Sequence, residues 1–208
     1  MIRHLCLQLA LLASLAWQTA LADQKPGTRC PPEGSNLVNG FRTECDVATI
    51  EGLKGHSASQ ILYEIAMEAN LPNDTFFRND SHVTCLLQDS SFALSGFAIG
   101  LGPVSITIPP IKYQGALCLY VADVPQGGLK LGQIRNLTKE LILKEGCGKC
   151  GWVTTNYLSK NVKQEGFVRI DWRTNANCIE NCIDPAKDLP PAAATDSPGK
   201  KSGVGALF

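Results

Sequence analysis

The chain has 208 residues, 44% of them hydrophobic, and its 19 basic and 19 acidic residues give a net charge of zero at pH 7. This length suits one domain with a hydrophobic core of its own. The balanced charge argues against a nucleic-acid-binding protein, because no basic stripe stands out along the sequence, and no acidic run marks a solvating tail.

The first 22 residues, MIRHLCLQLALLASLAWQTALA, predict a secretory signal peptide. Arg3 precedes an apolar run that ends near Trp17, and Ala20 and Ala22 occupy the small-residue positions of a cleavage site. The run is short for a membrane-spanning helix, so no stable insertion in a membrane is expected. The mature chain would therefore begin at Asp23 and be secreted into the extracellular space.

Cleavage would remove one of the nine cysteines, Cys6. Eight would remain, and an even number of cysteines in a secreted chain predicts four disulfides. The sequons at Asn73, Asn79 and Asn136 predict surface positions that carry N-linked glycans.

The first regular element expected along the mature chain is a helix over residues 57–70, after a Pro- and Gly-rich loop over residues 23–36. Ser57 and Gln60 have the spacing of a capping box, and apolar residues then recur at helical intervals. Residues 82–88 around Cys85 favour a strand.

Residues 90–111 contain no charged residue. Glycines and prolines interrupt the segment too often for a membrane-spanning helix, so it predicts a pair of strands with tight turns, either buried or facing a partner. A buried strand is expected over residues 116–124, where eight of nine residues are apolar.

The second helix is predicted over residues 129–145, with Gly146 as its C-terminal cap. Ile134, Leu137, Leu141 and Ile142 form its apolar stripe. A last strand is expected over residues 166–172, with Phe167, Ile170 and Trp172 assigned to nearly the same face.

From Asp184 onward the chain has too few apolar residues to fold alone, so residues 184–208 are predicted to be a disordered tail and residues 23–183 to form the domain.

Cys147 and Cys150 form a CxxC motif that is open to three interpretations. A redox centre is disfavoured, because the pair follows the negative end of a helix, where a thiolate is destabilised. A zinc site would need a second pair of ligands, which Cys178 and Cys182 could supply. Two separate disulfides to distant partners are the favoured interpretation.

The motif GCGKCG, followed by GFVRIDW and a cysteine at position 178, resembles the killer protein 4 family of fungal killer toxins. The resemblance extends over about residues 28–182, through Cys30, Cys45, the helix after Gly55 and the strand around Cys85. The chain differs from the family's small basic toxins in its neutral charge, in Val83 where their pattern has a lysine, and in its uncharged segment 90–111.

The resemblance implies an α/β sandwich of the α+β kind, in which an antiparallel sheet carries two helices and disulfides staple the fold. It also implies a bridge pattern, and the last pair joins the two cysteines that remain. The four expected bridges are Cys30–Cys147, Cys45–Cys150, Cys85–Cys178 and Cys118–Cys182.

The function that the resemblance implies is that of a secreted toxin or effector without enzymatic activity. It would act on a cell-surface protein of a competing microbe or a host, and the family's associated activity is inhibition of calcium channels. Lys149 and Arg169 are candidate contacts to a negatively charged target. No catalytic residue, metal or other cofactor is expected, and His56 and His82 are expected at the surface.

Two other classes of function are open. An extracellular structural or adhesive protein would use the uncharged segment 90–111 for association. A secreted hydrolase or oxidoreductase is the weakest alternative, because the sequence has neither a nucleophile elbow nor an HExxH motif.

Overall fold

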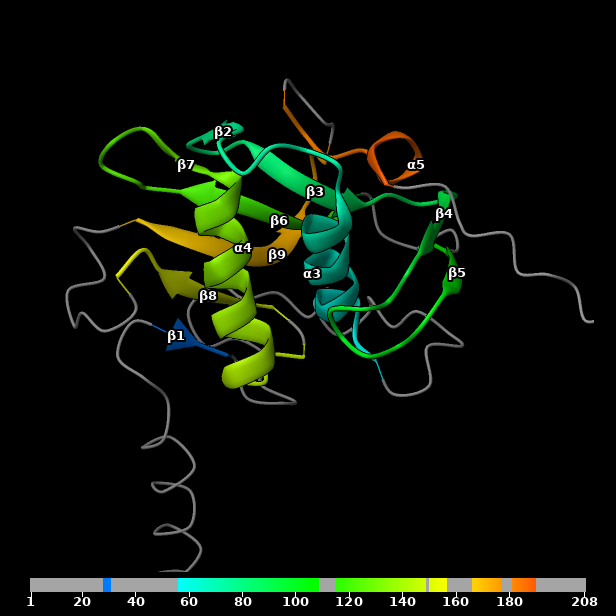
Figure 1. Cartoon of the computed structure of the whole chain (residues 1–208). Helices are drawn as coiled ribbons and strands as arrows, with labels where there is room; N and C mark the ends of the chain where they lie inside the picture. Colours follow the sequence, from blue (N-terminus) through cyan, green and yellow to red (C-terminus); the bar gives the residue numbers. More distant parts are fainter. Residues whose placement is uncertain are drawn as a thin grey trace, which may run out of the picture.

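A computed structural model describes residues 28–30, 56–108, 115–148, 150–156, 166–176 and 181–189 (Figure 1). The predicted signal peptide, residues 1–22, lies outside the described residues, as does the part of the predicted tail from residue 190 onward.

The centre of the fold is a five-stranded antiparallel sheet. Its strands are, in spatial order, β1 (Thr28–Arg29), β8 (Gly151–Thr154), β9 (Phe167–Arg173), β6 (Ala116–Ala122) and β3 (His82–Leu86). All seven residues of β6 are buried, which confirms the strand expected over residues 116–124. The sheet and the helices on it confirm the predicted disulfide-stapled α+β fold.

Helix α3 (Ala58–Glu68) confirms the first predicted helix. The capping box is present: the Gln60 amide donates to the Ser57 hydroxyl at 3.3 Å, and the Ser57 amide donates to the Gln60 side chain at 2.7 Å. These bonds satisfy two of the backbone donors that a helix start leaves unpaired.

Helix α4 (Leu131–Lys139) continues into a π-helical turn, η1 (Glu140–Lys144), and Gly146 follows at a φ of +70° in the predicted capping position. The helix begins two residues later than predicted, because Gly128–Lys130 forms strand β7 and pairs with β2 (Phe76–Arg78). A Cβ at Gly128 would lie 2.1 Å from the Phe77 carbonyl oxygen, so this close pairing requires glycine.

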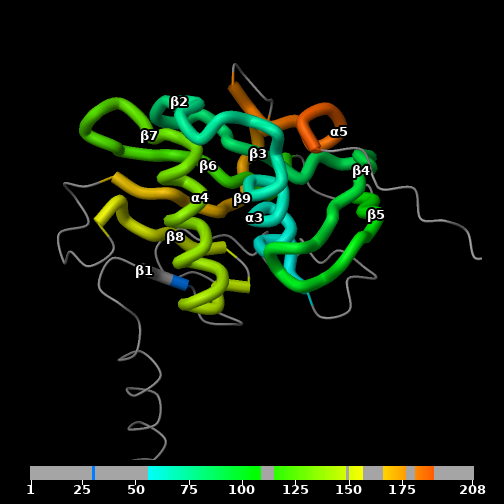
Figure 2. Tube along the Cα trace, viewed as in Figure 1, coloured from blue at the N-terminus to red at the C-terminus, as the bar shows by residue number. Residues whose placement is uncertain are grey.

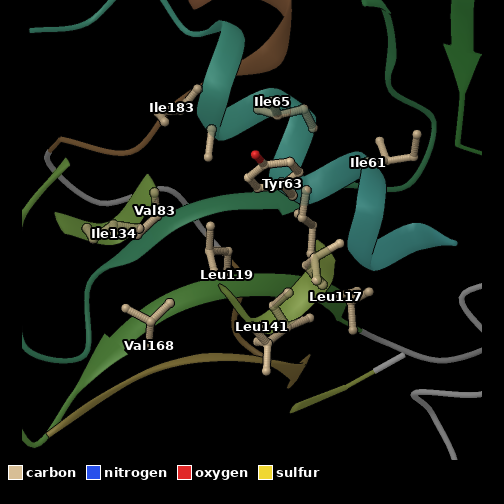
Figure 3. Packing of buried hydrophobic residues seen from close by; sticks show 14 of the residues in the cluster. Ile61, Tyr63, Ile65, Val83, Leu117, Leu119, Ile134, Leu141, Val168 and Ile183 are labelled. Atoms are coloured by element: carbon tan, nitrogen blue, oxygen red, sulfur yellow. The ribbon is translucent and has the colours of Figure 1, made fainter. Parts of the chain in front are cut away.

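Both helices lie on the same face of the sheet, α3 over β3 and β6 and α4 over β8 and β9 (Figure 1). Apolar side chains from the helices and the sheet interlock between the two layers (Figure 3). Helix α3 contributes Ile61 and Ile65, and the interior strand β6 contributes Leu117 and Leu119. The apolar stripe predicted for the second helix is buried throughout.

The uncharged segment forms a hairpin of β4 (Ser91–Leu94) and β5 (Val104–Thr107), which confirms the predicted strand pair. It lies beside α3, on the side away from α4 (Figure 1).

The predicted start of the tail at Asp184 is wrong, because residues 184–189 belong to the described fold. Helix α5 (Pro185–Asp188) follows the capping residue Asp184 and lies against β4 (Figure 2). Ile183 is fully buried, its amide donates to the Val83 carbonyl at 2.7 Å, and the Asp188 carbonyl accepts from Asn70. A short helix thus docks through backbone hydrogen bonds and one buried side chain. The amino-acid composition of the segment does not reveal such contacts.

The cysteine pairs confirm one predicted bridge and correct two. Cys30 is bonded to Cys147, as predicted. Cys85 is bonded to Cys118, so the predicted bridges Cys85–Cys178 and Cys118–Cys182 are wrong. The physical reason is the strand register: Cys85 and Cys118 stand directly opposite each other on β3 and β6, with Cα atoms 4.1 Å apart.

Cys150 and Cys182 each take part in a disulfide as well. Cys45 and Cys178 lie outside the described residues. The predicted bridge Cys45–Cys150 therefore stays a prediction. A disulfide between Cys147 and Cys150, the two cysteines of the CxxC motif, is excluded because Cys147 is bonded to Cys30.

Candidate functional site

Strand β9 carries the charged residues of the candidate site because its side chains alternate between the two faces of the sheet. The residues that join the core beneath the helices are Val168, Ile170 and Trp172. The residues of the opposite face are Phe167, Arg169, Asp171 and Arg173. Phe167 thus lies on the face opposite to Ile170 and Trp172, which corrects the predicted grouping.

A depression of about 330 Å³ opens where this strand ends. We call it the arginine depression, and it is lined by Tyr120, Arg169, Asp171, Trp172, Arg173, Thr174 and Asn175. It lies on and beside the sheet face that the helices leave uncovered, next to a second buried cluster that contains Cys118 and Ala116.

Arg169 is held in place from two directions. Its guanidinium forms an ion pair with Asp171, two residues along the same strand, and lies over the Trp152 ring at 6.0 Å from the ring centroid. Trp152 is opposite Arg169 in the register of β8 and β9, so the sheet itself sets this cation–π contact. Arg169 is thus a half-buried, oriented cation.

Arg173 is positioned by Tyr120. The Arg173 guanidinium carbon lies 4.7 Å from the centroid of the Tyr120 ring, and the two side chains are also hydrogen-bonded. On its other side the Tyr120 ring meets His82 edge-on, with ring centroids 6.3 Å apart. His82 is buried, so the expectation that it lies at the surface is wrong.

The electrostatics of the arginine depression combine burial with two cations. Burial raises the pKa of Asp171, and the Arg169 guanidinium opposes that rise. Burial likewise raises the pKa of Tyr120, again opposed by Arg169. Two guanidiniums against one carboxylate leave the lining with net positive charge at neutral pH.

This arrangement is suited to binding an anion. The oxygens of Asp171 are engaged, Oδ2 by Arg169 and Oδ1 by the backbone amide of Trp172 at 2.9 Å, so the carboxylate orients Arg169. Arginines offer planar, fixed donors that match carboxylate and phosphate groups. Their aromatic partners lower the entropy lost when the side chains are fixed on binding.

One group of metal-ligating residue types also occurs on this face of the sheet. Potential ligand atoms of His82, Cys85 and Cys118 lie within 4.8 Å of one another. The disulfide between the two cysteines removes both thiolates, which are the species that bind zinc.

Of the two predicted contact residues, Arg169 lines the arginine depression, and Lys149 lies outside the described residues. Sequence reasoning missed Arg173, Asp171 and Tyr120. The signal for the first two was present in FVRIDWR, where strict period-two alternation places positions 169, 171 and 173 on one face. The pairing of β9 with β6, which brings Tyr120 opposite Arg169, is not visible in the sequence.

The sequon residues differ in their surroundings. Asn73 and Asn136 are exposed. Asn79 instead ties two loops together, because its side-chain amide donates to the Val124 carbonyl and accepts from the Val124 amide, both at 2.9 Å. Glycosylation at the three sites stays a prediction.

We expect Asn79→Ala to lower the free energy of unfolding by about 2 kcal/mol, because each lost hydrogen bond contributes roughly 1 kcal/mol. Asn136→Ala, at an exposed position on α4, is the matched control and should leave stability within about 0.5 kcal/mol of the parent. Urea unfolding of protein produced without glycans measures both, and equal stability of the two variants would contradict the assigned role of Asn79.

No family model matches the chain, and no curated protein matches it. Within the described residues, no helix has both the length and the apolar character needed to cross a membrane.

Proposed function

We propose that the chain is a secreted, disulfide-stapled protein similar to fungal killer toxins, which acts without catalysis by binding a cell-surface target of a competing microbe or a host. The arginine depression is its binding surface. The observation that carries this proposal is the pair of guanidiniums, Arg169 and Arg173, each fixed against an aromatic ring on the sheet face away from the helices.

The target that fits this surface is an anionic site on an extracellular protein. Cation channels present such sites, because rings of Asp and Glu carboxylates attract permeant ions to their mouths. An oriented arginine would compete with calcium for those carboxylates, in line with the calcium-channel inhibition associated with the family that the sequence resembles. The positive charge would thus be local, on a chain whose net charge is zero.

Growth inhibition tests the proposal. Purified mature protein should slow the growth of fungal or plant cells, and added calcium should relieve the inhibition. Failure to inhibit any cell tested, at concentrations up to tens of micromolar, would contradict a toxin function.

Arg173→Gln should raise the concentration needed for half-inhibition about tenfold or more, since one charge-assisted contact contributes roughly 1.5–3 kcal/mol. This position is preferable to Arg169, whose removal would leave Asp171 without its ionic partner. Lys139→Gln is the matched control, because it removes the same charge from an exposed site on α4. Equal potency of the two variants would show that the arginine depression is not the binding surface.

A second candidate function is adhesion or self-association through the uncharged hairpin. Phe97 favours it, because this side chain is 89% exposed at the hairpin tip. Light scattering at micromolar concentration distinguishes the candidates: an oligomer that Phe97→Ser dissociates supports adhesion, and a monomer contradicts it.

A further inference from the structure

The turn between β4 and β5 is fastened to helix α3 by acidic side chains rather than by apolar packing alone. The Glu68 carboxylate accepts hydrogen bonds from the backbone amides of Ser95 at 2.9 Å and Gly96 at 2.8 Å. The Ser95 hydroxyl donates to the same carboxylate. A Cβ at Gly96 would lie 2.3 Å from the Gly102 carbonyl oxygen, so the turn closes tightly around this contact.

Glu64, one helical turn earlier, holds the rest of the turn. Its Oε1 accepts from the Ala98 amide and its Oε2 from the Ile99 amide, both at 2.9 Å. Glu64 is fully buried, and no cation among the described residues is paired with it, which is rare for a carboxyl group. Four backbone amides of one turn therefore depend on two carboxyl groups spaced i, i+4 on α3.

The two carboxyl groups bind the Gly96 and Ala98 amides of the same turn from positions one helical turn apart, and a hydrogen bond between them would require a shared proton. Burial, and then the bond to Glu68, raises the pKa of Glu64 to about 7. The pKa of Glu68 is lowered, because the bonds from Glu64, Ser95 and Gly96 outweigh its own burial. At mildly acidic pH the pair thus holds one proton and one negative charge.

Within the part of the chain that the structure describes, the charged groups on the elements packed against α3 are engaged elsewhere and do not compensate for a second negative charge. On the neighbouring elements, Arg135 of α4 donates to the carbonyls of Ala66 and Ala69, and Glu140 of η1 is paired with Lys144. His82 of β3 faces Tyr120.

Strands β4 and β6 also contact α3, and neither contains a residue that is charged at neutral pH. The other titratable neighbour of the pair is Tyr63, whose own pKa Glu64 helps to raise.

We propose that Glu64 and Glu68 form a proton-dependent latch, which holds the 95–99 turn against α3 while the pair shares a proton and releases the turn when that proton is lost to water. With both carboxylates ionised, two like charges lie in contact at a buried site, and the Glu64 side chain is expected to move toward solvent. The Ala98 and Ile99 amides then lose their acceptors. Because the turn carries the exposed Phe97, its release would also end the fixed presentation of this side chain.

The direction of the pH dependence follows from the two pKa shifts. A raised pKa means that the docked turn retains a proton that the released turn would lose, so docking weakens as pH rises from about 4.5 to about 7. The lowered pKa of Glu68 acts in the opposite direction below pH 4.5. Because the pKa of Glu64 rises from 4.5 to about 7, the docking equilibrium of the turn can weaken by at most roughly 300-fold.

Hydrogen exchange of the Ala98 and Ile99 amides, read by NMR and corrected for intrinsic exchange, tests the latch in the intact protein. Protection should fall at least tenfold between pH 5.5 and pH 8. Glu64→Gln removes the titration and keeps one acceptor oxygen, so one of the two amides loses its acceptor at every pH. The protection of the amide that keeps its acceptor should change less than twofold over the same range. Asp123→Asn, which replaces an exposed carboxylate far along the chain, should behave like the parent.

Protection that is independent of pH in the parent would overturn the proposal. An equal loss in Glu64→Gln would overturn it as well, because the loss would then belong to another group.

Discussion

Replacing Cys30 and Cys147 by alanine should lower the free energy of unfolding by about 3–5 kcal/mol, the range that the chain-entropy model gives for loops of this size. This bridge joins residues 117 positions apart and ties strand β1 to the end of η1. The upper value, about 5 kcal/mol, corresponds to closing the whole loop between Cys30 and Cys147, which are 117 residues apart. The lower value applies with the predicted bridge Cys45–Cys150 in place, because that bridge would shorten the loop that Cys30 and Cys147 close.

Urea unfolding of the double variant measures the loss, and the single variant Cys30→Ala identifies the partner. A thiol reagent applied to denatured, unreduced Cys30→Ala should label Cys147. Labelling of another cysteine, or a double variant as stable as the parent, would contradict the assigned bridge.

Leu119→Ala should cost about 2–5 kcal/mol, because it removes a fully buried side chain and leaves a cavity. Leu119 lies on the interior strand β6 and faces the helices, where the core has contributions from both layers (Figure 3). The backbone of β6 is held by strands on both sides, so it cannot move to close the space.

Leu143→Ala is the matched control, because this leucine is 43% exposed on η1. It should cost less than about 1 kcal/mol. A Leu119→Ala variant that loses no more stability than Leu143→Ala in thermal or urea unfolding would contradict the packing of the two layers.

Periodicity and capping signals in the sequence predicted the elements with the largest buried faces. The capping box at Ser57 and the apolar stripe of α4 are local features, so helices α3 and α4 followed from them directly. Strands β1, β2 and β7 have only two or three residues each, too few to show a period. They form because partners distant in the sequence supply their hydrogen bonds.

The disulfides illustrate the same limit. Cys30–Cys147 was carried over from a family resemblance and is confirmed, whereas Cys85 and Cys118 are paired by the register of β3 and β6. Register depends on the whole sheet, and position in the chain does not reveal it. Only part of the candidate site was predicted from the sequence, namely Arg169. Its partner Asp171 lies beside it because side chains alternate along β9, and Trp152 lies opposite it because β8 pairs with β9.

Recognition of a surface target by the arginine depression is tested by titrating fluorescently labelled mature protein onto intact fungal or plant cells and reading the bound fraction by flow cytometry. We expect saturable binding that calcium displaces, that Arg173→Gln weakens about tenfold or more and that Lys139→Gln leaves unchanged, in keeping with one charge-assisted contact. Binding that never saturates, or equal affinities of the two variants, would contradict a surface target recognised by the arginine depression.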